Sequence, residues 1–180
     1  TYHTYFFDRF TGEPVRVVTA QGYKVDSAWA QGLAWGIYGT ALAYRYTKET
    51  RCADLFKKVT DFYIRHLPKD RVPYWDLSFS DGNDEPKDSS AAAVAVCGIM
   101  EMCDNKGLAE EERKVYLKKA EEMLESLIDS YAVKSTEKSN GILMHGVYAK
   151  SSPYNSVSDR GVDECNIWGD YFYMEALVRS

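Results

Sequence analysis

The sequence lacks the features that mark several large classes of protein. No apolar run approaches the roughly 18 residues that a membrane-spanning helix needs, and Lys plus Arg (22) are outnumbered by Asp plus Glu (27). Phosphate binding needs a basic surface, so the net charge of -5 argues against nucleic acid as the main ligand. There is no H-x-x-H or Asp-rich metal spacing, no G-x-S-x-G and no glycine-rich phosphate loop. We therefore expect no metal, no cofactor, and neither a membrane nor nucleic acid as a partner.

Cysteine is scarce, and its spacing does not indicate a metal or redox motif. The four cysteines, Cys52, Cys97, Cys103 and Cys165, contain no C-x-x-C pair. This spacing favours free thiols over a disulfide framework or a zinc site. Cys97 and Cys103 lie in an apolar helical run, where we expect them to be buried.

The composition is that of one ordinary globular domain, with 45% hydrophobic and 27% charged residues. Its 14 tyrosines are typical of surfaces that face a sugar, a peptide or a partner. The chain begins at Thr1 rather than methionine and ends inside an expected helix, so we expect a piece of a longer protein. The ends therefore do not indicate a cytoplasmic or an exported protein.

Hydrophobic periodicity predicts five helices, over residues 27–47, 50–67, 90–103, 109–131 and from 166 to the end. Asp26 or Ser27 is expected to cap the first helix, and Asp88 or Ser89 the third. Residues 1–26 and the segments 68–88 and 132–164 are expected to be loops, with one short strand at 15–18. Inner helix, outer helix and long loop therefore alternate, which predicts an all-α protein built from α/α hairpins. Periodicity leaves open whether the array is closed or open.

The first helix carries an unusual stretch, DSAWAQGLAWGIYG at 26–39. Gln31, Trp35 and Tyr38 share one helical face, and an amide, an indole and a phenol side by side suit a sugar. The alternative is that Trp35 and Tyr38 are simply core residues. On the neighbouring face, glycines 32, 36 and 39 are expected to let another backbone approach closely.

Few other residues indicate chemistry. His66 is expected to bond the last carbonyls of the second helix, whereas His3 and His145 lie in expected loops where either could reach a ligand. Among the carboxylates, Asp76 has the environment best suited to acid–base work, because Trp75 and Tyr74 beside it could raise its pKa by desolvation.

Four blocks together resemble a known family. They are the run from His3 through TAQGYKVDSAWAQGLAWGIYG (19–39), PYWD (73–76), KDSSAAAVA (87–95) and VDECNIWGDYFYMEALVR (162–179). In order and approximate spacing they are similar to the unsaturated glucuronyl hydrolases of glycoside hydrolase family 88. The resemblance implies an (α/α)6 barrel, an α/α toroid of which this chain would form about half, as its C-terminal part.

The resemblance also implies an activity, the removal of a 4,5-unsaturated uronic acid from the non-reducing end of lyase-generated oligosaccharides. The family hydrates the vinyl ether, and the aspartates that do so are expected upstream of this chain, so the fragment alone should be inactive. His3, Gln21, Trp35 and Gln31 correspond to substrate-binding positions, and we add Tyr38 and Trp75. Gln31 stands where the family has arginine, so a neutral amide replaces a charged fork.

Two other functions remain open on the sequence. One is a non-catalytic helical module that binds a glycan or a protein partner. The other is an unsaturated rhamnogalacturonyl hydrolase, whose tryptophan-rich segment is a weaker version of this one. In either case a truncated ring would expose apolar helix faces at its break, which predicts self-association through that edge.

Overall fold

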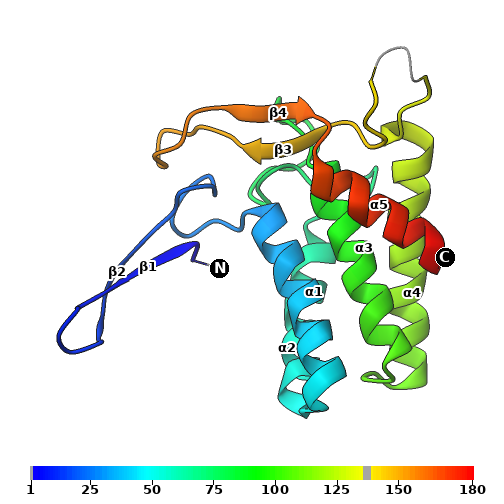
Figure 1. The fold of residues 1–180 in the computed structure, drawn as a ribbon, viewed down its shortest axis with the longest axis horizontal. Helices are drawn as coiled ribbons and strands as arrows, with labels where there is room; N and C mark the ends of the chain where they lie inside the picture. Colours follow the sequence, from blue (N-terminus) through cyan, green and yellow to red (C-terminus); the bar gives the residue numbers. More distant parts are fainter. Residues whose placement is uncertain (1, 136–138) are drawn as a thin grey trace.

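The computed structural model describes residues 2–135 and 139–180, and its framework is helical (Figure 1). The helices are α1 (Ala30–Thr47), α2 (Thr50–Arg65), α3 (Ser89–Asp104), α4 (Glu110–Ser126) and α5 (Ile167–Arg179). A π-helical turn, η1 (Leu127–Tyr131), continues α4. All five predicted helices are therefore confirmed, including the extension of the fourth to Tyr131.

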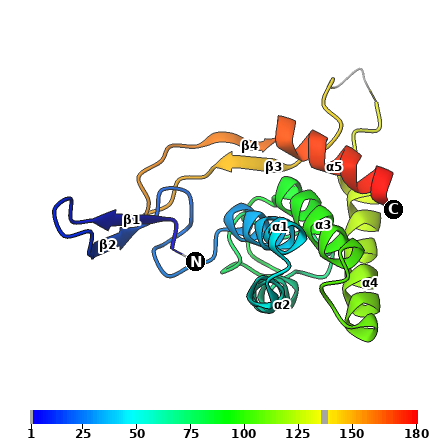
Figure 2. The same cartoon turned by 60° about the horizontal axis from the view of Figure 1, so that its bottom comes forward.

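The helices form two layers (Figures 1 and 2). Helices α1, α3 and α5 lie side by side, while α2 packs against α1 and α4 packs against α3 on the other side of that row. Helix α3 is buried along nearly its whole length. Helices α1, α4 and α5 all contact α3, in line with its small apolar start, AAAVAV. The predicted alternation of inner and outer helices is thus present within this chain.

The close approach of α1 and α3 depends on Gly98 of α3. A Cβ atom at this position would lie 2.7 Å from the backbone nitrogen of Tyr38, closer than real contacts allow. The prediction that the glycines of α1 serve this purpose was wrong. Nothing lies within 4 Å of a Cβ on Gly39, and Gly36 would meet only Val59, at 3.6 Å.

Helix α1 begins three residues later than predicted. Trp29 is its N-cap and offers no side-chain hydrogen bond, whereas Asp26 forms an ion pair with Lys24. The segment before the helix pairs with residues 75–77 instead. Trp29 forms an isolated β-bridge with Asp76, and Leu77 N–H donates to the carbonyl of Ala28 at 2.8 Å. These long-range hydrogen bonds keep residues 27–29 outside the helix.

The cap predicted at Asp88 is confirmed, because its side chain accepts from Ala91 N–H at the start of α3. Asn166, which was not predicted as a cap, accepts from Gly169 N–H at the start of α5. His66 Nδ1 lies 2.7 Å from the carbonyl oxygen of Phe62 at the end of α2.

Two β-hairpins accompany the helices. Strand β1 (Thr4–Phe7) pairs antiparallel with β2 (Pro14–Val18), and β3 (Gly146–Ala149) pairs antiparallel with β4 (Arg160–Glu164). The strand predicted at 15–18 is confirmed, but the other three lie in segments predicted as loops. The β3–β4 hairpin extends across the N-terminal ends of the inner helices toward the segment before α1 (Figure 1).

The four cysteines are free thiols, with Cys97 and Cys103 buried as predicted. Within residues 2–135 and 139–180, no helix has both the length and the apolar character required to cross a lipid bilayer.

Candidate functional site

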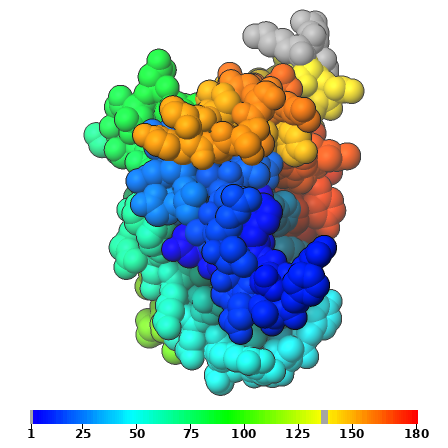
Figure 3. Space-filling model, turned by 90° about the vertical axis from the view of Figure 1, so that its left-hand side faces the viewer, coloured from blue at the N-terminus to red at the C-terminus, as the bar shows by residue number. Residues whose placement is uncertain are grey.

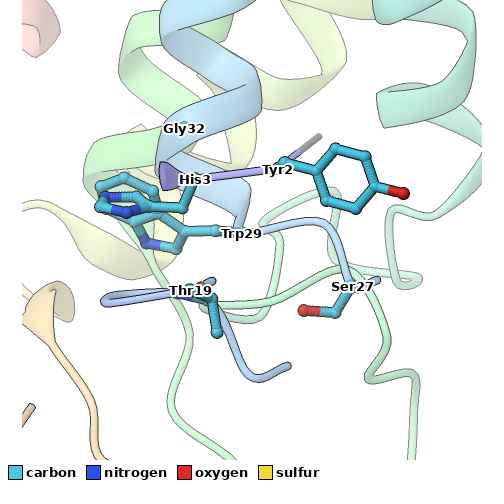
Figure 4. A pocket seen from close by; sticks show the side chains of 7 residues that line it. Tyr2, His3, Thr19, Ser27, Trp29 and Gly32 are labelled. Carbon is cyan, nitrogen blue, oxygen red and sulfur yellow. Dashed lines mark hydrogen bonds between the residues drawn. The ribbon is translucent and has the colours of Figure 1, made fainter. Parts of the chain in front are cut away.

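A cavity of about 250 Å³ lies at the N-terminal end of α1 (Figure 4). Three separate segments contribute to it: the first residues of the chain, the connection between β2 and α1, and the first turn of α1. Its lining consists of Tyr2, His3, Thr19, Gly22, Ser27, Trp29 and Gly32. It offers an imidazole, hydroxyl groups and a large aromatic ring within one small space, and we call it the His3–Trp29 cavity.

The Trp29 indole owes its position to Gly32. A Cβ atom on Gly32 would lie 2.7 Å from Cε3 of Trp29, so glycine lets the indole lie against the first turn of α1. The His3 ring packs against Trp29 with centroids 5.5 Å apart and an interplanar angle of 62°, and Figure 4 shows the two rings side by side. His3 Nδ1 lies 2.6 Å from Oγ1 of Thr4, so Nε2 is the ring nitrogen that can meet a ligand.

Residues 19–27, which we call the floor of the cavity, are held by hydrogen bonds from side chains. Thr19 Oγ1 accepts from Gly22 N–H at 2.8 Å, and the Ser27 hydroxyl donates to Asp76 Oδ2 at 2.6 Å. The same Asp76 oxygen accepts from Tyr23 N–H at 2.9 Å. Asp76 is fully buried. The structure therefore gives this carboxylate, the best acid–base candidate in the sequence, the role of anchoring the floor.

Of the predicted site residues, His3 lines this cavity and Gln21 lies next to it. Gln21 lines a second cavity of about 380 Å³, together with residues of β3 and of the β3–β4 loop. Its Nε2 donates to the carbonyl of Tyr148 at 3.0 Å. The segment 19–22 thus separates two neighbouring cavities, and Arg160 supplies a cation to the second.

Gln31 lies in the packing between inner helices, with 3% of its surface exposed. Its Oε1 is 2.9 Å from Ser90 Oγ, which also lies 2.6 Å from Asp88 Oδ1 and accepts from Trp168 Nε1 at 3.1 Å. Serine has one hydroxyl proton, so Ser90 can donate to Asp88 or to Gln31, not to both at once. Gln31 Nε2 is buried without a partner.

Asp88 is the most perturbed carboxyl group near the site. It is fully buried, and its Oδ1 accepts from the N–H groups of Ala91 (3.2 Å) and Val147 (3.3 Å) while Oδ2 has no partner. Burial raises the pKa of Asp88 to about 6, against the lowering effect of its hydrogen bonds from Ser90 and the backbone. A neutral Asp88 is therefore accessible close to physiological pH.

Trp35 and Tyr38 lie together on the side of α1 that faces α5. Both rings pack edge-on against Phe172, with centroids 5.3 and 5.2 Å away. Trp35 is 39% exposed, and burial, followed by the charge of Glu175, raises the pKa of Tyr38 to about 12. Trp75 is 1% exposed, and its Nε1 donates to Glu85. The structure thus brings Trp35 and Tyr38 together but places Trp75 in the core.

Sequence reasoning missed Trp29, Tyr2, Thr19 and Ser27 as lining residues. One local signal was available for Trp29, because a glycine three residues after a tryptophan leaves room for the indole on the helix. The others reach the cavity through contacts between distant segments.

Within the part of the chain that the structure describes, no group of three His, Cys, Asp or Glu side chains could hold a metal ion.

Comparison with known proteins gives relatives over nearly the whole chain, although no protein-family model matches it. The chain is 48% identical over 179 residues to the unsaturated chondroitin disaccharide hydrolase of Streptococcus pneumoniae (strain ATCC BAA-255 / R6), covering 99% of this chain and 44% of that protein. It is 33% identical over 179 residues to the unsaturated glucuronyl hydrolase of Bacillus sp. (strain GL1), covering 99% and 46%.

Solved structures agree. The crystal structure of unsaturated glucuronyl hydrolase from Streptococcus agalactiae matches with a TM-score of 0.89 and 46% identity, over 99% of this chain and 43% of that chain. An aspartate-to-asparagine variant of that enzyme, complexed with dGlcA-GalNAc6S, matches with a TM-score of 0.85 and 46% identity, over 99% and 46%. The chain spans less than half the length of the relatives it matches.

Proposed function

We propose that this chain, which belongs to the unsaturated glucuronyl hydrolase family, supplies the sugar-binding part of a glycoside hydrolase. The enzyme would remove a 4,5-unsaturated uronic acid from the non-reducing end of an oligosaccharide left by a polysaccharide lyase. Relatives with 46 to 50% identity are named unsaturated chondroitin disaccharide hydrolases. We therefore take an unsaturated chondroitin disaccharide as the substrate.

The observation that carries this proposal is the pairing of His3 and Trp29 over a floor of hydroxyl groups. A sugar ring has an apolar face that stacks on an indole and hydroxyls at its rim that bond polar groups. Trp29 offers the indole, while His3 Nε2 and the hydroxyls of Thr19 and Ser27 lie around it. Gln21 lies beside this cavity, in a position to contact the second sugar of the oligosaccharide.

The reaction would be hydration of the vinyl ether. A carboxylic acid protonates C4 and activates the water that adds at C5, and the resulting hemiketal opens with loss of the glycosidic bond. The cavity lining contributes an imidazole, hydroxyls and aromatic rings, so we assign these residues to binding and orienting the ring. The proton donor would come from aspartates outside these 180 residues. Gln31, Trp35 and Tyr38 remain candidates for the wall that faces that missing part.

We also propose that the chain is the C-terminal half of an (α/α)6 ring. Support comes from the row of α1, α3 and α5 with α2 and α4 behind it, and from the share of each relative that is covered. Helix α5 exposes an apolar stripe at helical spacing, made of Ile167, Tyr171, Met174 and Val178. In a ring the next helix would cover this stripe. In the isolated chain it would favour self-association, which light scattering on wild type and on Met174→Asp can test.

The loss of the ultraviolet absorbance of the unsaturated disaccharide tests the activity. The full-length enzyme should turn it over, whereas the 180-residue chain should bind the disaccharide without consuming it. In the full-length enzyme, Trp29→Ala should raise the KM at least tenfold, because a stacking surface is lost. Turnover by the 180-residue chain would contradict the placement of the acids, and a full-length protein that binds without turnover would favour a non-catalytic glycan-binding module.

A further inference from the structure

The turn at Gly22 and Tyr23, which forms part of the floor of the His3–Trp29 cavity, has all four of its backbone polar groups bonded by side chains. On the amide side, Gly22 N–H donates to Thr19 Oγ1 at 2.8 Å, and Tyr23 N–H donates to Asp76 Oδ2 at 2.9 Å. Thr19 lines the cavity, and Asp76 is the fully buried carboxylate that also accepts from the lining residue Ser27. The amide side of the turn is therefore held from within.

The carbonyl side is held from the other hairpin. Asn155 Nδ2 donates to the carbonyl of Gly22 at 3.0 Å, and the Ser152 hydroxyl donates to the carbonyl of Tyr23 at 2.5 Å. Both side chains belong to the loop 150–159 between β3 and β4, more than 120 residues away along the chain. Figure 3 shows this loop, in orange, lying over the blue N-terminal segment.

Two further contacts join the same pair of segments. Gln21 Nε2 donates to the carbonyl of Tyr148 at 3.0 Å, and the rings of Tyr23 and Tyr154 meet edge-on with centroids 5.4 Å apart. Each residue from 21 to 23 thus has a partner in β3 or in the loop that follows it. The turn and the hairpin are positioned as one unit.

The loop is also braced internally, so it can act as a fixed support. Asp159 accepts from Ser151 N–H at 2.6 Å and pairs with Lys150 at 3.3 Å across the neck of the loop. Hydrogen bonds from Ser151 lower the pKa of Asp159 to about 2. Asn155 Nδ2 donates to the carbonyl of Lys150 at 2.9 Å as well, so one amide group ties the neck of the loop to the turn.

We propose that Ser152 and Asn155 are positioning residues of the sugar site. Neither residue lines the His3–Trp29 cavity or the cavity of Gln21. They fix the carbonyls of Gly22 and Tyr23, and thereby the wall that separates the His3–Trp29 cavity from the cavity of Gln21. Because a shift of about 1 Å in a binding wall can cost a large factor in rate or affinity, their loss should appear in substrate binding. The inference rests on the proposed function.

The decisive variant is Asn155→Asp in the full-length enzyme, compared with Asn155→Ala. At pH 7 the aspartate would place a carboxylate against the carbonyl oxygens of Gly22 and Lys150. We expect the KM for the unsaturated chondroitin disaccharide to rise about tenfold with kcat within twofold. As the pH falls through about 4, the ordinary pKa of an aspartate, the protonated carboxyl can donate again, so the KM of Asn155→Asp should return toward wild type while that of Asn155→Ala stays high.

Ser152→Ala should raise the KM several-fold, and Ser151→Ala is its matched control, because the hydrogen bonds of Ser151 go to Asp159 within the loop and not to the turn at Gly22 and Tyr23. The melting temperature should change little in all four variants, since the loop lies outside the helical core. KM values equal to wild type in Asn155→Asp and Ser152→Ala would overturn the proposal, as would an equal rise in Ser151→Ala or the absence of recovery at low pH. A wild-type enzyme that leaves the disaccharide intact would instead overturn the proposed function.

Discussion

The inner helices α1, α3 and α5 are joined differently at their two ends. At the N-terminal end, beside the His3–Trp29 cavity, Ser90 Oγ of α3 accepts from Trp168 of α5 and lies 2.9 Å from Oε1 of Gln31 of α1. Asp88 lies beneath them, with a pKa raised by burial. This end is polar but carries few fixed charges.

At the C-terminal end the same three helices are joined by ion pairs. Glu101 of α3 is 2% exposed and lies 3.3 Å from Arg45 of α1 and 2.8 Å from Arg179 of α5. Both arginines belong to the last turns of their helices, where a cation complements the helix dipole. The buried carboxylate at the C-terminal end, Glu101, is thus paired with arginines, whereas the one at the N-terminal end, Asp88, has no cation beside it in the described part of the chain and can be neutralised only by a proton. The two ends should respond differently to mutation and pH.

The largest effect is expected from Glu101→Ala. It removes a buried carboxylate from two arginines and leaves Asn105 without the acceptor at 2.8 Å. Breaking a buried pair typically costs about 3–5 kcal/mol, and we expect the lower part of that range, because Arg179 keeps Glu175 and Asp104 as partners. Urea unfolding measures the change. Glu125→Ala, on an exposed residue, is the control. A loss of unfolding free energy below about 1 kcal/mol in Glu101→Ala would mean that these ion pairs contribute little to holding the three helices together.

The next effect concerns pH. Because the pKa of Asp88 is raised in the folded state, protonation favours folding: this contribution is complete below pH about 4 and is lost as the pH rises through 6. A shift of about two units corresponds to on the order of 3 kcal/mol. Asp88→Asn keeps an N-cap acceptor and should remove this loss.

Unfolding free energies measured from pH 4 to 8 give the comparison for Asp88→Asn. The variant should gain on wild type through pH 4–6 and keep that advantage above it. Asp129→Asn, on an exposed residue, should run parallel to wild type. If the unfolding free energy of Asp88→Asn ran parallel to that of wild type over this pH range, the inferred titration of Asp88 would be wrong.

The smallest effect is expected from two glycine substitutions in α1, which distinguish sugar binding in the cavity from the stability of the helix. Gly32→Ala adds a Cβ 2.7 Å from Trp29, whereas Gly39→Ala in the same helix meets nothing within 4 Å. Both gain roughly 1 kcal/mol of helix propensity. We expect Gly39→Ala to be more stable with unchanged sugar affinity, and Gly32→Ala to lose about tenfold in affinity, or about 1.4 kcal/mol, with little net change in stability. Calorimetric titration with the unsaturated disaccharide would contradict this if both variants bound alike.

The sequence predicted the helical elements well because their signals are local. These signals are the apolar stripes of α2 and α4, the small residues of α3 and the cap at Asp88, and each acts within one or two turns. The start of α1 was predicted too early because residues 27–29 pair with 75–77. The residues near Asp26 in the sequence give no sign of this pairing with a segment almost fifty residues away.

The candidate site was harder to predict because neighbouring residues in the cavity are distant in the chain. Trp75 was predicted to meet substrate, but the structure gives its indole the partner Glu85 and a buried position. Trp35 and Tyr38 pack on Phe172, more than 130 residues later. Trp29 was overlooked although Gly32 marks the space that it occupies.

The sequence by itself determined the helices, the alternation of inner and outer layers, and the four blocks that relate the chain to unsaturated glucuronyl hydrolases, because periodicity, capping and motif order are properties of neighbouring residues. Only the tertiary structure decided that Gly98 rather than the glycines of α1 permits the close helix contact. It also decided that Trp29 and His3 form a cavity whose floor is held by Ser152 and Asn155. These outcomes depend on which distant backbone groups find a partner, and a buried or half-buried polar group takes the partner that the fold brings to it.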